Sequence, residues 1–162
     1  MSAYAFVNYV RFRELNGTYT SYAFQNFSVN QTRTYDGISH LFAPFALATG
    51  GGEKGGDRSS NVLVTGSSTQ VGSTIILNLF RQAVEDRWLL EVKTVSLNIS
   101  SFADDTLLST ETWRIAAYDL DDTSIQLRLS SPLDAAKAQV PGRRLSQRLV
   151  GALPVTASIS TS

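Results

Sequence analysis

Apolar and polar side chains alternate with a period of two along much of this chain, and no other feature constrains its fold as strongly. The clearest example is SIQLRLSS, where Ile125, Leu127 and Leu129 share one face while Gln126 and Arg128 take the other. Successive side chains of a β-strand point to opposite faces, so this pattern predicts a strand with one buried face. The same pattern occurs in YAFVNYVRFREL, LLEVKTVSLNIS and ETWRIAAYDL. We therefore expect a mainly β protein of antiparallel strands.

Two turn signals divide the N-terminal part of the sequence. Asn16-Gly17 predicts a two-residue hairpin loop after the first strand, because Asn-Gly tolerates the positive φ that such a loop requires. The run from 18 to 35 is rich in β-branched and aromatic residues and ends at a second signal, Asp36-Gly37. These signals predict three strands in a meander up to Leu47.

One helix is predicted, at about residues 73–87. Its apolar face has helical spacing and consists of Val71, Ile75, Ile76, Leu79, Phe80, Ala83, Val84 and Trp88. Ile75 and Ile76 leave the first turn open to being strand. The preceding NVLVTGSSTQVGS is close to a glycine-rich phosphate turn, but Gln70 stands where the middle glycine is needed. A strand-to-helix turn capped by Ser and Thr is the favoured interpretation.

At 162 residues the chain suits one domain with an appended segment. Residues 1–131 are expected to form an antiparallel β-sandwich or barrel of about six to eight strands with one flanking helix. The glycine-rich stretch at residues 49–60 predicts a flexible loop that becomes ordered against a partner. Residues 132–162 are expected to form an extended C-terminal assembly arm, since Pro132 and Pro141 restrict the backbone.

Composition argues against most site chemistries. The chain has 14 basic and 14 acidic residues. It has no cysteine, and this absence excludes disulfides, thiolate metal sites and cysteine nucleophiles. His40 is the only histidine, and no G-x-S-x-G motif accompanies it. No apolar run is long enough for a membrane span, and we expect a cytoplasmic chain with no membrane partner. The sequence therefore predicts no cofactor, no metal and no catalytic residue.

A basic segment follows the last clear strand. It contains Lys137, Arg143, Arg144 and Arg148 without any aromatic residue to stack on a base. This composition favours carboxylates on a protein partner over nucleic acid. The final stretch, PVTASISTS at residues 154–162, alternates again and predicts a strand that can add to the sheet edge of another subunit; a frayed end is the alternative.

The order of these features resembles the small minor tail and baseplate hub proteins of long-tailed bacteriophages, including relatives of the lambda-type minor tail protein L. The resemblance rests on Ser131-Pro132-Leu133-Asp134, on Pro141-Gly142-Arg143-Arg144, and on Gly37, Ile38, Phe42, Pro44 and Phe45. The lambda-type relatives carry C-terminal cysteines that can hold an iron–sulfur cluster. This chain has no cysteine, so no cluster is carried over.

The resemblance implies a tail-tube-like fold, two packed antiparallel sheets with a flanking helix, in a structural, non-enzymatic protein of the virion. Such a protein is assembled in the host cytoplasm and forms a trimeric or hexameric ring around the tail channel, as an adaptor at the baseplate hub or the tube-to-baseplate junction. Its partners would be its own copies and neighbouring tube or hub proteins, with channel DNA only in passing.

Two groups of residues receive a role on this interpretation. The expected subunit interface comprises Glu53, Lys54, Pro132, Leu133, Asp134, Pro141, Arg143, Arg144 and Arg148. The expected lumen-facing acidic turn comprises Asp119, Asp121 and Asp122, which would repel passing DNA.

Two other classes of function stay open at the level of sequence. One is a small carbohydrate- or peptide-binding β-sandwich, with a platform of exposed Tyr4, Tyr9, Tyr19 and Tyr22. The other is a carboxylate-dependent glycosidase or lyase, for which no convergent set of titratable residues is visible.

Overall fold

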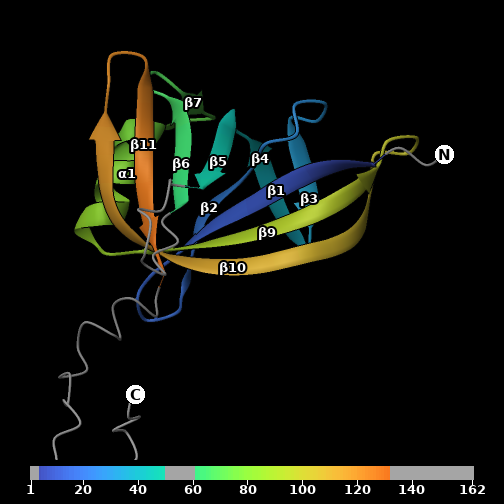
Figure 1. Cartoon of the computed structure of the whole chain (residues 1–162), viewed down its shortest axis with the longest axis horizontal. Helices are drawn as coiled ribbons and strands as arrows, with labels where there is room; N and C mark the ends of the chain where they lie inside the picture. The colour runs from blue at the N-terminus through green and yellow to red at the C-terminus, as the bar shows by residue number, and fades with distance from the viewer. Residues whose placement is uncertain (1–3, 50–60, 132–162) are drawn as a thin grey trace, which may run out of the picture.

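The computed structural model describes residues 4–49 and 61–131, and these form eleven strands and one helix (Figure 1). The elements are β1 (Tyr4–Arg13), β2 (Tyr19–Gln25), β3 (Thr32–Tyr35), β4 (Ile38–Phe42), β5 (Phe45–Thr49), β6 (Asn61–Gly66), β7 (Gln70–Val71), β8 (Thr74–Ile75), α1 (Ile76–Glu85), β9 (Leu89–Asn98), β10 (Ala103–Leu120) and β11 (Ser124–Ser130). The prediction of a mainly β chain with one helix is confirmed.

Nine of the strands form a single open sheet in the order β3-β4-β2-β1-β9-β10-β11-β6-β5. The sheet is mixed, because β2 pairs with β4 in parallel while the other neighbours are antiparallel. The predicted sandwich or barrel of six to eight strands is therefore wrong in its details: there are more strands, and the large sheet is not closed. The small pair β7-β8 lies outside it.

The 18-residue strand β10 explains why one sheet replaces two. It pairs with β9 from Ala103 to Arg114 and with β11 from Arg114 to Leu120. Register shifts between Asp104 and Thr106, between Leu107 and Ser109, and between Ile115 and Ala117 mark irregularities along it. Irregularities of this kind bend a strand without ending it. In Figure 1 the sheet accordingly turns upward along β10 instead of splitting into two layers.

The predicted three-stranded meander is also wrong. The run from 18 to 35 contains two strands, β2 and β3, and β4 inserts between them in the sheet. The buried side chain of Gln25 ends β2: its amide nitrogen donates to the Asn30 carbonyl at 2.8 Å, and its oxygen accepts from the Phe27 amide at 2.6 Å. These two hydrogen bonds pair backbone groups of the loop that follows β2. They therefore favour a bend after Gln25 over a longer strand.

The two predicted hairpin turns exist, with one difference. Asp36 and Gly37 have φ values of 53° and 74° and connect β3 to β4 as a two-residue loop. The first hairpin closes instead through backbone bonds between Glu14 and Thr18 and between Gly17 and Glu14, with Gly17 at φ 95°. The loop thus has three residues, Leu15 to Gly17, and ends in a left-handed glycine.

Helix α1 is shorter than predicted, because Ser73 precedes the strand β8 and not a helical turn. The helix begins after Ile75, which makes no side-chain cap, so the expected Ser and Thr cap is absent. The end is a Schellman motif: the amide of Arg87 (φ 55°) donates to the Val84 carbonyl, and that of Trp88 to the Ala83 carbonyl. Trp88 then packs into the core.

The major core lies between α1 and one face of the sheet. Its buried residues from the helix are Ile76, Leu79, Phe80 and Ala83, and those from the strands include Val10, Phe12, Phe24, Leu63, Leu90, Val92, Ile115, Ile125, Leu127 and Leu129. The alternation predicted for β11 is confirmed, since Ile125, Leu127 and Leu129 are all within this core.

A minor core occupies the opposite face of the same long strands. It contains Val7, Tyr9, Val95 and Leu97, with Phe27 and Tyr35 packed against them. Val7 and Tyr9 have odd numbers in β1 whereas Val10 and Phe12 have even numbers, so the two cores use different faces of β1. The three long strands β1, β9 and β10 form a ribbon. The major core covers one face of this ribbon at the end that holds Val10 and Phe12, and the minor core covers the opposite face toward Val7.

Candidate interaction surface

All nine residues of the predicted subunit interface lie outside the described residues. They are Glu53, Lys54, Pro132, Leu133, Asp134, Pro141, Arg143, Arg144 and Arg148. Their role in assembly stays a prediction, as does the ordering of the glycine-rich loop.

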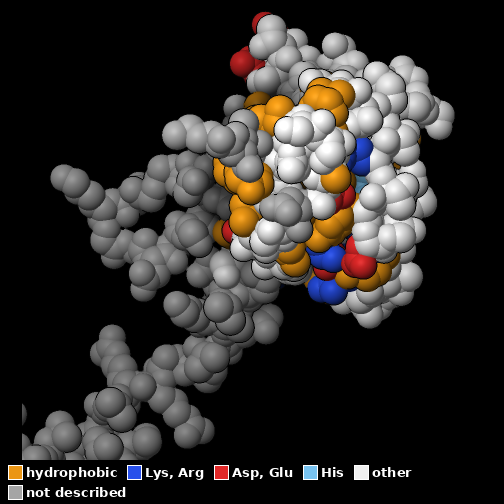
Figure 2. Space-filling view, turned by 90° about the vertical axis from the view of Figure 1, so that its right-hand side faces the viewer, with side chains coloured by type: hydrophobic (Ala, Val, Ile, Leu, Met, Phe, Trp, Pro, Cys, Tyr) orange, Lys and Arg blue, Asp and Glu red, His pale blue; other side chains and the backbone are white. Residues whose placement is uncertain are grey.

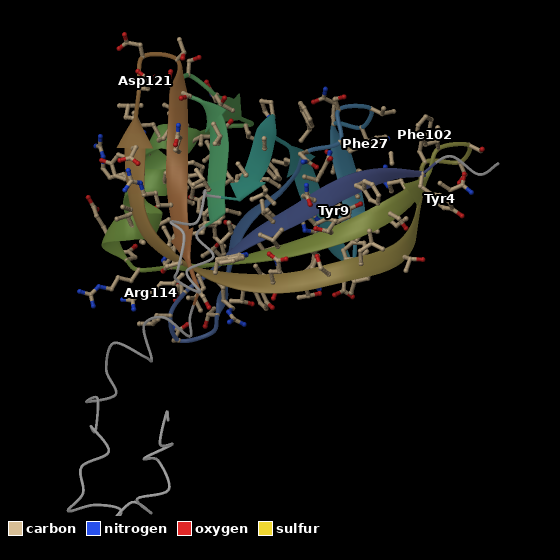
Figure 3. All side chains as sticks on the ribbon, viewed as in Figure 1. Tyr4, Tyr9, Phe27, Phe102, Arg114 and Asp121 are labelled. Atoms are coloured by element: carbon tan, nitrogen blue, oxygen red, sulfur yellow. The ribbon has the colours of Figure 1, made fainter. Side chains whose placement is uncertain are left out.

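The predicted acidic turn is present at the tip of the β10-β11 hairpin, where Figure 3 places Asp121 far from Tyr4. Asp119, Asp121 and Asp122 are all exposed. Arg128 donates to Asp119, and the Asp122 amide donates to the Asp121 carboxylate at 2.8 Å. Because Arg128 compensates Asp119, the negative charge at the tip comes from Asp121 and Asp122.

A network of polar side chains lies over the minor core and centres on Arg33 of β3. Its guanidinium donates to the Tyr9 hydroxyl at 2.9 Å and to the Asp104 carboxylate at 2.9 Å. It also donates to the side-chain oxygen of Asn30 at 2.8 Å and to the Phe102 carbonyl at 2.9 Å. The Tyr9 hydroxyl in turn donates to Asp104 at 2.8 Å. The network joins β3 to β1, β10 and the β9-β10 loop.

Burial sets the protonation of two groups beside this network. The pKa of Tyr9 is raised to about 12, chiefly because its hydroxyl is removed from water. The pKa of His40 is lowered, first by burial and further by the nearby cations Arg11 and Lys93. The Tyr9 ring stacks on Tyr35 with centroids 4.6 Å apart and meets the edge of His40 at 4.9 Å. Both groups are therefore neutral at pH 7.

The arrangement leaves little room for a substrate. The cavity lined by Tyr9, Tyr35, His40, Glu91 and Lys93, among others, measures about 10 Å³, enough for about one water molecule. His40 itself is only 2% exposed, and its Nδ1 is 2.9 Å from the Ile38 carbonyl. The hydrogen bonds of Arg33 and Tyr9 are made within the protein. We interpret the network as a structural joint between strands.

The described residues contain neither a cluster of metal ligands nor a helix suited to a membrane span. In residues 4–49 and 61–131 no three His, Cys, Asp or Glu side chains gather in a way that would hold a metal ion. The one helix in these residues is too short and too polar to cross a membrane.

The tyrosine platform of the alternative interpretation does not form. Tyr9 is buried, and Tyr22 packs beside Trp88 at the major core. Tyr19 donates to Glu91 at 2.8 Å and lies under the guanidinium of Arg11. Tyr4 and Tyr19 are the exposed pair, at 52% and 41%. Four rings from these positions therefore cannot present one exposed binding face.

An exposed apolar surface lies instead at the end of the ribbon beyond the helix, and we call it the apolar end. It consists of Tyr4 and Phe6, which stand on the part of the β1 face that α1 does not reach. Four more exposed apolar side chains lie at the same end of the ribbon: Ile99, Phe102, Leu107 and Leu108. Of these, Phe102 packs on Phe27 and Leu107 pairs with Val95, so both belong to the minor-core face. Phe6 is 63% exposed and Tyr4 is 52% exposed. Figure 2 looks onto this side of the molecule and shows hydrophobic side chains at the surface in several places. Exposed apolar side chains gathered at one end of the molecule are a candidate interaction surface.

Sequence reasoning missed the apolar end for a definite reason. Tyr4, Phe6, Val10 and Phe12 share one parity, so the pattern predicts that all four face the core. The structure buries only Val10 and Phe12, because α1 covers that half of the ribbon and not the other. Alternation identifies the face of a strand, but it does not show how far along the strand that face is covered.

The comparisons with known proteins leave this surface unassigned. No protein-family model matches the chain, and a search of curated proteins finds no significant match.

Proposed function

We propose that this chain is a structural protein of a phage tail, a ring-forming adaptor at the baseplate hub or the tube-to-baseplate junction. The observation that carries the proposal is the apolar end, where Phe6 and Tyr4 stand exposed on a sheet face that the fold leaves bare. A subunit that works inside a permanent assembly buries such a surface against its neighbours. Neighbouring copies and tube or hub proteins are the proposed partners.

The polar chemistry of the described residues supports the same proposal. Arg33, Tyr9 and Asp104 are committed to one another, and Lys93 lies 3.2 Å from Asp36. The site of an enzyme instead presents convergent polar groups to a cavity. We therefore propose a non-enzymatic role, with no cofactor.

The tail-tube-like architecture belongs to this proposal as well. A strongly bent sheet that folds over one helix is a compact wall element, and copies of it side by side would surround a channel. Asp121 and Asp122 would then face the channel and repel passing DNA. Trimeric and hexameric rings are both compatible with the proposal.

The mass of the particle in solution tests the proposal. Light scattering should be measured at several concentrations for the full chain and for a chain truncated after Ser131. We expect discrete trimers or hexamers for the full chain and a smaller species for the truncated chain. A full chain that is monomeric at every concentration, and that does not bind tail proteins, would refute the adaptor function.

A further inference from the structure

Strand β1 has a sheet edge that is free along half its length. It pairs with β9 over all ten residues, from Tyr4 opposite Asn98 to Arg13 opposite Leu89. Its pairing with β2 covers only Tyr9 to Arg13. The stretch from Tyr4 to Val7 thus has a paired neighbour on one side only.

The direction of the backbone groups along this edge follows from two hydrogen bonds. The Asn8 amide donates to the Asn26 side chain at 2.9 Å, and the Phe12 carbonyl accepts from Thr20 of β2 at 2.8 Å. Even-numbered residues of β1 therefore direct their N–H and C=O groups away from β9. Since these directions alternate along a strand, Tyr4 and Phe6 present their N–H and C=O groups to the free edge.

This edge lacks the charges, the prolines and the bulges that protect many sheet edges from pairing. The segment from Tyr4 to Asn8 contains no charged residue and no proline, and its ladder with β9 has no register shift. The exposed rings of Tyr4 and Phe6 flank it on one face. The sheet ends in two outer edge strands, β3, which includes Arg33, and β5, which directly follows Pro44. The edge of β1 is the better acceptor for an added strand.

We propose that residues 154–162 of a neighbouring copy add to this edge as a strand. The chain leaves the described fold at Ser131, and the 22 residues 132–153 can span up to about 70 Å when extended. In PVTASISTS, Val155, Ala157 and Ile159 share one face, small hydroxyl side chains take the other, and there is no charge. The apolar face matches Tyr4 and Phe6.

The inference rests on the proposed function and gives it a mechanism of assembly. Insertion into a neighbour's sheet links subunits, whereas insertion into the same subunit's sheet would fill the edge without linking anything. The backbone pairs supply affinity, and the match of apolar side chains to the two rings fixes the register.

Substitutions in the full-length chain test both partners of the pair. Phe6→Pro removes the outward N–H but leaves the β9 ladder to Ala5 and Val7, and Phe6→Thr is the matched control that keeps the N–H. Ile159→Asp places a charge on the inserted apolar face, and Ser160→Asp places the same charge on the opposite face. Light scattering gives the oligomer dissociation constant, and hydrogen exchange reports the Tyr4 and Phe6 amides.

We expect Phe6→Pro and Ile159→Asp each to weaken the oligomer at least tenfold. Phe6→Thr loses the ring but keeps the N–H, so it should weaken the oligomer at least threefold less than Phe6→Pro, and Ser160→Asp should change it less than threefold. We also expect Ile159→Asp to speed exchange of the Phe6 amide at least tenfold in a chain that is otherwise wild type, a result that does not depend on whether Phe6→Pro folds. An oligomer unaffected by Ile159→Asp, with an unprotected Phe6 amide, overturns the strand addition and leaves the ring proposal standing. A monomeric chain whose Phe6 amide is protected at every dilution shows insertion within one subunit, which also overturns the inference.

Discussion

Replacement of Arg33 by methionine is the sharpest test of how this fold is held together. Within the described residues, Arg33 is the only residue of β3 whose side chain makes hydrogen bonds to β1, to β10 and to the β9-β10 loop. Methionine keeps an unbranched apolar stem of comparable length but donates no hydrogen bond. The substitution therefore removes the joint between strands with little change in packing.

The expected cost follows from burial. The Arg33 side chain is 9% exposed and that of Asp104 is 23% exposed. Removal of one member of a buried ion pair costs about 3–5 kcal/mol, because the other charge stays desolvated. Water can partly rehydrate Asp104, so the low end applies, and we expect the free energy of unfolding to fall by about 3 kcal/mol. For a chain of this size that is a fall in Tm of about 10 °C.

Urea unfolding followed by circular dichroism measures this change, and Arg128→Met provides the matched control. Arg128 also pairs with an aspartate, Asp119, but the two side chains are 63% and 48% exposed. An exposed pair contributes about 0–1 kcal/mol, so the control should lose far less stability. Equal losses for both variants, or a loss below about 1 kcal/mol for Arg33→Met, would refute the role assigned to the buried network.

Three further predictions concern the histidine, the helix and its end. The pKa of His40 is lowered in the folded chain, so the free energy of unfolding should be highest above about pH 6.5 and fall as the pH drops toward the folded pKa. In urea titrations at several pH values, His40→Gln should reduce this dependence on pH. An unchanged dependence would contradict a buried, neutral His40. Arg87→Gly should raise the free energy of unfolding by about 1 kcal/mol, because Arg87 has φ 55°; calorimetry showing a lower Tm would count against strain at this position. Leu79→Ala should destabilise by about 3 kcal/mol, since Leu79 is 2% exposed under the sheet; a loss below 1 kcal/mol in the same assay would mean that α1 packs loosely.

Local patterns predicted the elements of this fold better than their assembly. The alternation in β11 identified its buried residues, and Asp36-Gly37 identified a turn, because each depends on neighbours in sequence. The order β3-β4-β2 was not predictable in this way. It depends on the loop that Gln25 organises, and a glutamine in an apolar run carries no signal of that role.

The candidate site was the least predictable part. The apolar end exists because α1 is only ten residues long and covers one half of the ribbon. Arg33 and Asp104 are 71 residues apart in sequence, and no spacing rule connects a threonine-flanked arginine with a carboxylate at that distance. Both features depend on which segments meet in space.

The pairing of β1 with β9 has a consequence for synthesis on the ribosome. Tyr4 pairs with Asn98, 94 positions later, so β1 has no partner on that side until most of the domain has been made. At about 5–20 residues per second this wait lasts about 5–20 seconds. Closing a loop of that length costs about 4 kcal/mol of chain entropy before any contact offsets it. During this interval the β1-β2 hairpin exposes Val10 and Phe12, because neither α1 nor β9 yet covers them. We expect chaperones to bind the nascent chain at this stage. The protease sensitivity of ribosome-stalled chains should drop only once β9 has emerged.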